Sequence, residues 1–202
     1  MTTFFLIRHG LNDWVDHRLA GWLPEVRLNS RGRAQVERLA DRLRRTHFDA
    51  VVSSPLERAL ETAAPLAALA GVQVQISEAI GEIRIGEWTG RSLADMQSDE
   101  AWRRFNVFRG GTRAPGGELM LETQVRIINE VLHLRTRYPE GTVAVVTHGD
   151  PLRAAVGYFL GAPLDMFLRL EISPASISIV RIDDWSACVA CVNDTAHLDG
   201  ES

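Results

Sequence analysis

Short apolar runs alternate along this chain with longer segments whose apolar residues recur at helical spacing. The runs at 3–7, 49–52 and 142–146 predict strands, and the first of them has the composition of a strand buried on both faces. Residues 72–76 alternate between aliphatic residues and glutamine, as a half-buried strand does. The longer segments predict helices over 30–45, 55–70, 117–138 and 150–160.

For two of these helices the sequence makes more detailed predictions. Before the helix at 55–70, Ser54 suits an N-cap, Pro55 the first helical position and Glu57 the second half of a capping box. On the helix at 117–138, helical spacing predicts a buried stripe of four residues: Leu121, Val125, Ile128 and Leu132.

The remaining segments complete the predicted architecture. Residues 176–182 and 187–192 look like a closing hairpin, and the pattern loosens over 80–117, where only short helices are expected. Alternating strands and helices predict the α/β class. We expect a three-layer α/β/α sandwich with a mostly parallel sheet, built as a single domain over 1–202 with a short lid insertion at 84–117.

Composition narrows the possible functions. The net charge of −4 argues against a nucleic-acid partner. No apolar run approaches the ~18 residues that span a bilayer, so we expect no membrane association and a cytoplasmic location. All 22 basic residues are arginine, which excludes lysine Schiff bases and the lysine-containing phosphate loop.

The two cysteines, Cys188 and Cys191, have the C-x-x-C spacing of some redox and metal sites. They lie in a predicted strand, where an odd spacing points them to opposite faces. No second cysteine pair is present to complete a zinc site. We therefore expect neither redox nor metal chemistry from them.

Polar residues follow three of the predicted strands directly. They are Arg-His-Gly at 8–10, Ser-Ser at 53–54 with Arg58 soon after, and Thr-His-Gly at 147–149. If these strands are parallel and adjacent, all three groups meet at one edge of the sheet, where ligands bind in such folds. Two arginines and two histidines there predict a cationic pocket for a phosphoryl group. A metal site using His9 and His148 is the weaker alternative, because the arginines repel a dication.

Five motifs in order resemble the histidine phosphatase superfamily, also called phosphoglycerate mutase-like. They are Arg-His-Gly at 8–10, Ser-Ser-Pro-Leu-Glu-Arg-Ala-Leu-Glu-Thr-Ala at 53–63, Glu-Ile-Arg-Ile-Gly-Glu-Trp-Thr-Gly at 82–90, Pro-Gly-Gly-Glu at 115–118 and Thr-His-Gly-Asp at 147–150. The resemblance implies that His9 is the nucleophile and forms a phosphohistidine. It implies that Arg8, Arg58 and His148 bind the phosphoryl oxygens and that Glu82 is the proton donor. It implies no metal and no cofactor.

The chain also departs from the family pattern. Leu11 and Asn12 stand where members often have Glu or Gln followed by Ser or Thr, and Val15 stands where an Asn is common. We expect the Asn12 amide to bind phosphate in place of that missing Asn. In the lid, most aromatic and arginine side chains are expected to be structural, with one or two arginines contacting a second anionic group of the substrate.

The sequence therefore predicts a metal-independent phosphatase that hydrolyses small phosphate monoesters through His9. Two alternatives stay open: a phosphoglycerate-type mutase, which usually needs a longer, closed lid, and a non-catalytic phospho-ligand binder. The physiological substrate is not specified by the motifs. The hairpin near 176–192 either pairs between subunits of a homodimer or finishes the sheet.

Overall fold

A six-stranded sheet forms the centre of the computed structural model, which describes residues 1–198; the last four residues of the expected domain lie outside the described residues. The strand order is β3-β2-β4-β1-β5-β6; β1, β2, β3 and β4 are parallel, whereas β5 pairs antiparallel with both β1 and β6. The strands are β1 (Thr2–Arg8), β2 (Ala50–Ser53), β3 (Val74–Ile76), β4 (Thr142–Thr147), β5 (Ile177–Ile182) and β6 (Ala187–Asp194).

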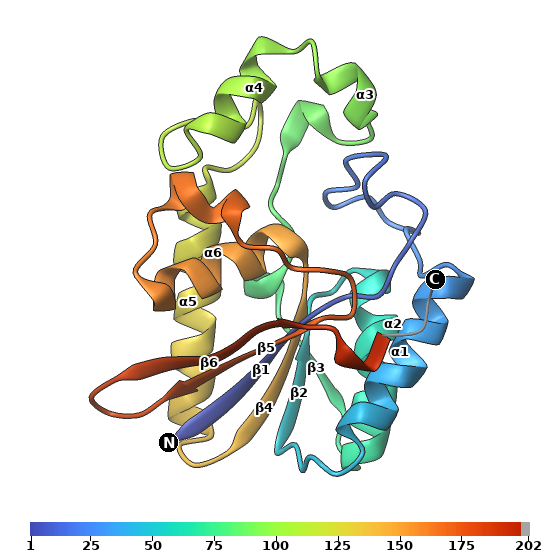
Figure 1. Cartoon of the computed structure of the whole chain (residues 1–202), viewed down its shortest axis with the longest axis vertical. Coiled ribbons are helices and arrows are strands. Elements are labelled where there is room, and N and C mark those ends of the chain that lie inside the picture. Colours follow the sequence, from blue (N-terminus) through green and yellow to red (C-terminus); the bar gives the residue numbers. More distant parts are fainter. Residues whose placement is uncertain (199–202) are drawn as a thin grey trace.

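Helices cover both faces of this sheet (Figure 1). One face is covered by α1 (Ser30–Leu43) and α2 (Glu57–Ala70), the other by α5 (Met120–Arg137) and α6 (Gly149–Leu160). The shorter helices are α3 (Leu93–Met96), α4 (Glu100–Val107) and the 3-10 turns η1 (Glu78–Ile80), η2 (Gly86–Trp88), η3 (Leu164–Arg169) and η4 (Ala196–Leu198). The predicted three-layer α/β/α sandwich with a mostly parallel sheet is confirmed.

Strand β1 contributes to both hydrophobic cores, as its apolar composition predicts. Phe4 and Leu6 are buried among residues of α5 and α6, whereas Ile7 is buried among residues of α1 and α2. Alternate side chains of a strand point to opposite faces, so a strand between two helical layers needs apolar residues at consecutive positions. This burial anchors the strand that ends at Arg8 and His9.

Helix α2 begins later than the capping pattern predicts. Its N-cap is Leu56, which makes no side-chain cap hydrogen bond. Ser54 instead lies two residues before that cap, with its hydroxyl bonded to His148, and Glu57 accepts a hydrogen bond from the backbone of Glu25. The capping-box prediction was therefore wrong, because tertiary contacts engage both side chains.

The buried stripe predicted for α5 was also largely wrong. Of its members, Ile128 is buried, but Leu121, Val125 and Leu132 are 46%, 50% and 39% exposed. The helix instead buries an adjacent face formed by Met120, Thr123, Ile127, Ile128, Val131 and Leu134. Apolar residues occupy two neighbouring faces of this helix, and only its docking on the sheet selects one of them. Leu160, the last residue of α6, is also apolar and 49% exposed.

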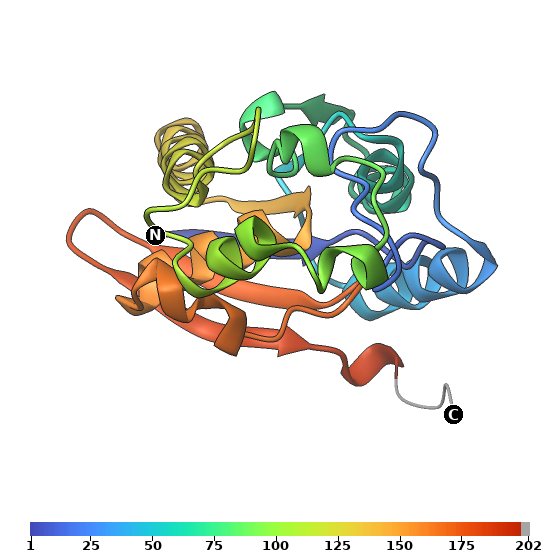
Figure 2. The same ribbon diagram turned by 90° about the horizontal axis from the view of Figure 1, so that it is seen from above.

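The segment 84–117, which we call the lid segment, lies above the carboxyl ends of the parallel strands (Figure 1). Seen from above, α3 and α4 cross over this end of the sheet (Figure 2). A third hydrophobic cluster joins the lid segment to the sheet domain through Trp88, Phe105, Met120 and Phe167. Gly86 has φ +53°, and a Cβ there would lie 2.0 Å from the Pro115 carbonyl oxygen, so the start and end of the lid segment approach closely only with glycine.

Strand β6 forms one edge of the sheet and carries both cysteines. Cys188 is exposed, Cys191 is partly buried, and both thiols are free. Cys188 pairs with Arg181 and Cys191 with Ile179 across the β5–β6 hairpin. Within residues 1–198, no helix is both long enough and apolar enough to cross a membrane.

Candidate active site

The three strand ends that carry polar residues are neighbours in the sheet. β4 lies between β1 and β2, and the register pairs Arg8 with Thr147 and Ser53 with Val146. His9 and His148 therefore follow adjacent strands, and their imidazole rings lie edge to face with centroids 5.1 Å apart. The predicted convergence is present.

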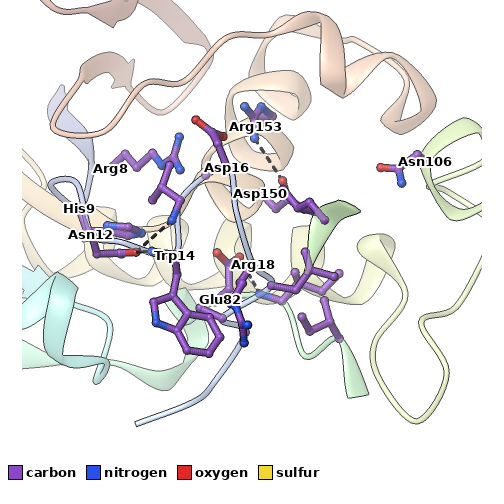
Figure 3. Close-up of a pocket in the computed structure, with 18 of the residues that line it drawn as sticks. Arg8, His9, Asn12, Trp14, Asp16, Arg18, Glu82, Asn106, Asp150 and Arg153 are labelled. Carbon is purple, nitrogen blue, oxygen red and sulfur yellow. Dashed lines mark hydrogen bonds and ion pairs between the residues drawn. The ribbon is translucent and has the colours of Figure 1, made fainter. Parts of the chain in front are cut away.

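A cavity of about 310 Å³ opens beside these residues, beneath the lid segment. Figure 3 shows His9, Asn12 and Arg8 near one end of it and Asp150 and Arg153 farther along. Five of the six predicted site residues line this cavity: Arg8, His9, Asn12, Arg58 and Glu82. The sixth, His148, is fully buried beside His9.

His9 is held in one tautomer by the backbone. Its Nδ1 lies 2.7 Å from the Gly10 carbonyl oxygen, and since a carbonyl only accepts, Nδ1 carries the proton. Burial lowers the pKa of His9 well below its ordinary value, and the charges of Arg58 and Arg8 lower it further. The ring is therefore neutral at pH 7, with the lone pair on Nε2. This is the state that a nucleophile requires.

Backbone carbonyls orient both arginines. Nη1 of Arg8 donates to Ile172 at 2.7 Å, and Nη2 of Arg58 donates to Gly21 at 2.9 Å. Each guanidinium also has a buried nitrogen, Nε of Arg8 and Nη1 of Arg58, with no hydrogen-bond partner among residues 1–198. Unpartnered buried donors are costly, and an oxyanion satisfies them.

His148 adds a third buried, unpartnered nitrogen. Its Nε2 is 2.7 Å from the Ser54 hydroxyl oxygen, while its Nδ1 is buried and has no hydrogen-bond partner in the part of the chain that the structure describes. Burial, with the charge of Arg58, lowers the pKa of His148 well below its ordinary value. The neutral ring thus offers a single N–H. Together with the two arginines, it matches the several oxygens of a phosphoryl group.

Glu82 lies at the same end of the cavity. One of its carboxyl oxygens accepts from the Ile83 N–H at 2.9 Å, and the other lies 3.9 Å from Nδ1 of His148. Burial, and then the charge of Asp150, raise the pKa of Glu82 to about 7. A carboxyl group with this pKa exchanges protons readily at neutral pH, as a general acid and base must.

Asn12 shapes the loop that follows β1. Its side-chain oxygen accepts from the N–H groups of Trp14 and Val15, at 2.9 and 3.2 Å. These bonds use the oxygen and orient the amide NH2 group, for which no partner exists among the described residues. The NH2 group is consequently available as a donor, and its contact with phosphate stays a prediction.

Four charged groups of the cavity were not assigned a role from the sequence: Asp16, Arg18, Asp150 and Arg153. Asp150 forms ion pairs with Arg109 at 2.9 Å and with Arg153 at 3.2 Å. The lid segment was expected to provide one or two arginines to the substrate; of Arg103, Arg104, Arg109 and Arg113, only Arg109 lines the cavity within the described part of the chain. The sequence offered one signal, since Asp150 directly follows the Thr-His-Gly motif.

Comparisons with known proteins agree with this geometry. The profile of the histidine phosphatase superfamily (branch 1) matches residues 4–195. Phosphoserine phosphatase 1 of Hydrogenobacter thermophilus is 30% identical over 200 residues, covering 98% of this chain and 95% of that protein. A probable phosphoglycerate mutase, GpmB, of Enterobacter sp. strain 638 is 30% identical over 209 residues, covering 98% and 96%.

A solved structure supports the same assignment. YhfR of Bacillus stearothermophilus superposes with a TM-score of 0.92 at 30% identity, covering 98% of this chain and 100% of that one. The match extends over nearly the whole length of both proteins, so it includes the strand ends and the lid segment. This chain belongs to the histidine phosphatase superfamily, branch 1.

Proposed function

We propose that this protein hydrolyses small phosphate monoesters through a phosphohistidine on His9. One observation carries the proposal: three buried, unpartnered nitrogen atoms, on Arg8, Arg58 and His148, surround a histidine whose free lone pair is on Nε2. Donors placed in advance where negative charge develops stabilise the transition state of phosphoryl transfer. Both named relatives come from classes that act on phosphate esters.

The proposed reaction has two displacements. In the first, Nε2 of His9 attacks phosphorus, the bond from phosphorus to the ester oxygen breaks, and the Glu82 carboxyl group protonates the leaving oxygen. In the second, the Glu82 carboxylate takes a proton from water, the water oxygen attacks phosphorus and the phosphorus–Nε2 bond breaks. Inorganic phosphate leaves, and both residues return to their starting protonation states.

The donor set favours a mechanism without a metal. Nδ1 of His9 is protonated and faces Gly10, and two guanidinium groups lie beside the nitrogen that would have to bind a cation. Neutral imidazole nitrogens and carboxylates are the usual metal ligands, whereas neighbouring fixed cations oppose them. The arginines supply the charge that a magnesium ion supplies in other phosphoryl-transfer enzymes.

The mutase alternative requires a site for a second anion on the substrate. Arg109, the lid arginine of the cavity, is already paired with Asp150, and Asp150 also engages Arg153. A further carboxylate, Asp16, stands at the same part of the cavity. These carboxylates offset much of the positive charge outside the phosphoryl pocket, which favours hydrolysis of monoesters over retention of a doubly anionic intermediate.

The wider predictions belong to the same proposal. The chain acts as a single catalytic unit in which the lid segment covers the site. A cytoplasmic location is supported by the free, exposed thiol of Cys188, since exposed thiols persist in reducing compartments.

Pairing of β6 between two copies stays a prediction, which a measurement of the protein's mass in solution tests.

The decisive experiment uses p-nitrophenyl phosphate and 3-phosphoglycerate. We expect release of inorganic phosphate from both and an acid-labile, base-stable phosphate on the protein, all lost in His9→Ala. His133→Ala, which changes an exposed histidine on α5, is the matched control and keeps full activity. Isomerised phosphoglycerate would instead identify a mutase, and retained phosphate binding without either product would identify a binder.

A further inference from the structure

Asp16 stands at the mouth of the cavity, in the loop between β1 and α1 (Figure 3). Its backbone has φ +62°, a conformation that costs most residues roughly 1 kcal/mol and that Asp and Asn tolerate better than other non-glycine residues. In the view of Figure 3 its carboxylate lies between Arg8 and Arg153. The loop therefore holds an acidic side chain next to the phosphoryl pocket.

The carboxylate of Asp16 differs from the other carboxyl groups that line the cavity. Asp150 pairs with two arginines, and Glu82 accepts a backbone hydrogen bond. Asp16 makes neither a hydrogen bond nor an ion pair within 4 Å to any residue in the range 1–198. Arg18, two residues later, lies over the Trp14 ring, 5.7 Å from its centroid.

An unpaired carboxylate at this place opposes the binding of an ordinary substrate. The phosphoryl group is a dianion, so a carboxylate near its site repels it and weakens the binding of the substrate. The repulsion is offset only if the substrate itself brings a positive charge to the carboxylate. A substrate compensates when it carries a positive charge on the carbon chain beyond the ester oxygen. The same carboxylate then attracts the correct substrate and repels the others.

We propose that Asp16 makes the enzyme selective for phosphate esters of amino alcohols, with the carboxylate of Asp16 receiving the substrate's ammonium group. This inference rests on the proposed phosphatase function and adds the chemical class of the leaving group. A cavity of about 310 Å³ suits a short aliphatic chain, and the side chains of Leu19, Ile83 and Ile85 provide an apolar wall for its carbon atoms.

The test compares esters that differ only in that ammonium group. O-phosphoserine and 3-phosphoglycerate form one pair, with an ammonium or a hydroxyl group on the same carbon; phosphoethanolamine and 2-hydroxyethyl phosphate form a second. We expect kcat/KM to favour the ammonium member of each pair by about fivefold, the size of an exposed ion pair. Asp16→Asn keeps the size of the side chain and its tolerance of positive φ, and it should bring both ratios close to one.

Asp95→Asn is the matched control, since Asp95 lies on α3 and does not line the cavity. This variant should keep the wild-type ratios. If the ratios of kcat/KM for the paired esters are the same in the wild type and in Asp16→Asn, Asp16 does not select the substrate. This conclusion holds even if His9-dependent hydrolysis of p-nitrophenyl phosphate is normal.

Calorimetry separates this outcome from a failure of the proposed function. Binding of phosphoethanolamine and 2-hydroxyethyl phosphate to His9→Ala, with and without Asp16→Asn, reports the preference without turnover. A preference that disappears with Asp16→Asn supports the inference even if no ester is hydrolysed by the wild type, a result that would overturn only the phosphatase proposal. No preference in binding and none in turnover overturns the inference about Asp16.

Discussion

The Ser54 hydroxyl group lies between His148 and the start of α2, 2.7 Å from Nε2 of the imidazole and 3.3 Å from the backbone nitrogen of Leu56. The Leu56 N–H donates to the hydroxyl oxygen, so the hydroxyl proton is free to point at Nε2. In this arrangement Nε2 accepts, and the ring proton resides on Nδ1, which lies 3.9 Å from Glu82. Ser54 thus orients the proton that His148 offers to the cavity.

Replacing Ser54 by Ala should allow both tautomers of His148. We expect kcat to fall several-fold, because one phosphoryl donor is lost from part of the enzyme population. Nitrogen NMR of the imidazole should show protonated Nδ1 in the wild type and a mixture in Ser54→Ala. Ser54→Thr keeps a hydroxyl group and should restore both the tautomer and the rate. An unchanged imidazole spectrum in Ser54→Ala contradicts this role.

Glu82→Gln should affect substrates according to their leaving groups. An alkoxide needs a proton as it leaves, so hydrolysis of alkyl phosphates should fall by about 10² to 10⁴. Hydrolysis of p-nitrophenyl phosphate should fall less in the phosphorylation step, because p-nitrophenolate is already a stable anion. With a pKa of about 7 for Glu82, wild-type phosphorylation of alkyl substrates should slow as the pH rises above about 7.

Single-turnover kinetics across pH measure this phosphorylation step directly. Glu87→Gln is the control, since Glu87 is exposed and lies outside the cavity. Equal losses for alkyl and p-nitrophenyl esters in Glu82→Gln would show that Glu82 does not protonate the leaving group.

The same carboxyl group makes stability depend on pH. The pKa of Glu82 is about 7 in the folded state and 4.5 as an ordinary glutamate, so the folded state holds the proton more tightly. Protonated Glu82 therefore contributes fully to the free energy of unfolding below pH 4.5. This contribution, of up to about 3 kcal/mol, is lost as the pH rises to about 7. Urea unfolding should show that the free energy of unfolding of Glu82→Gln increases relative to that of the wild type between pH 5 and pH 8. A difference that does not vary with pH would contradict the raised pKa.

Arg109 connects the lid segment to the catalytic end of α6. Its side chain is 3% exposed, pairs with Asp150 at 2.9 Å and packs 4.3 Å from the centroid of the Phe105 ring. Removing one partner of such a pair leaves a poorly solvated charge, so Arg109→Met should lower the free energy of unfolding by about 3 kcal/mol. It should also lower kcat/KM, because the lid segment loses its tie to Asp150.

The pair between Arg113 and Glu122 provides the control. Both of its side chains are about half exposed, and Arg113→Met should lower the free energy of unfolding far less than Arg109→Met does. A double-mutant cycle of Arg109→Met with Asp150→Asn should show coupling, and strictly additive effects would rule out the connection.

Asn12→Ala should weaken the binding of inorganic phosphate. The side-chain oxygen of Asn12 accepts hydrogen bonds from Trp14 and Val15, and the residue lines the cavity. We expect the inhibition constant of phosphate to rise several-fold, as for the loss of one hydrogen bond to a charged group. Asn12→Asp keeps the oxygen that caps the loop and replaces the donor, so it should also bind phosphate poorly. An unchanged constant in both variants would exclude Asn12 from the phosphate site.

Much of the site was predictable because it depends on strand ends. An apolar run identifies a buried strand, and adjacent parallel strands deliver their following residues to one edge. This argument places His9 beside His148 without side-chain coordinates. Glu82 was different, since it lies in an irregular segment and was assigned through the family resemblance alone.

The sequence by itself determined the alternation of strands and helices and the chemistry at the strand ends, because local composition and spacing encode both. Only the tertiary structure decided which face of α5 is buried, why Ser54 bonds His148 instead of capping α2, and that Arg109 meets Asp150. Each of these depends on how segments distant in the sequence pack together. The local sequence of each segment is compatible with more than one such packing. The unpaired carboxylate of Asp16 belongs to this second group, because a side chain in a loop acquires its neighbours only when the lid segment and α6 are in place.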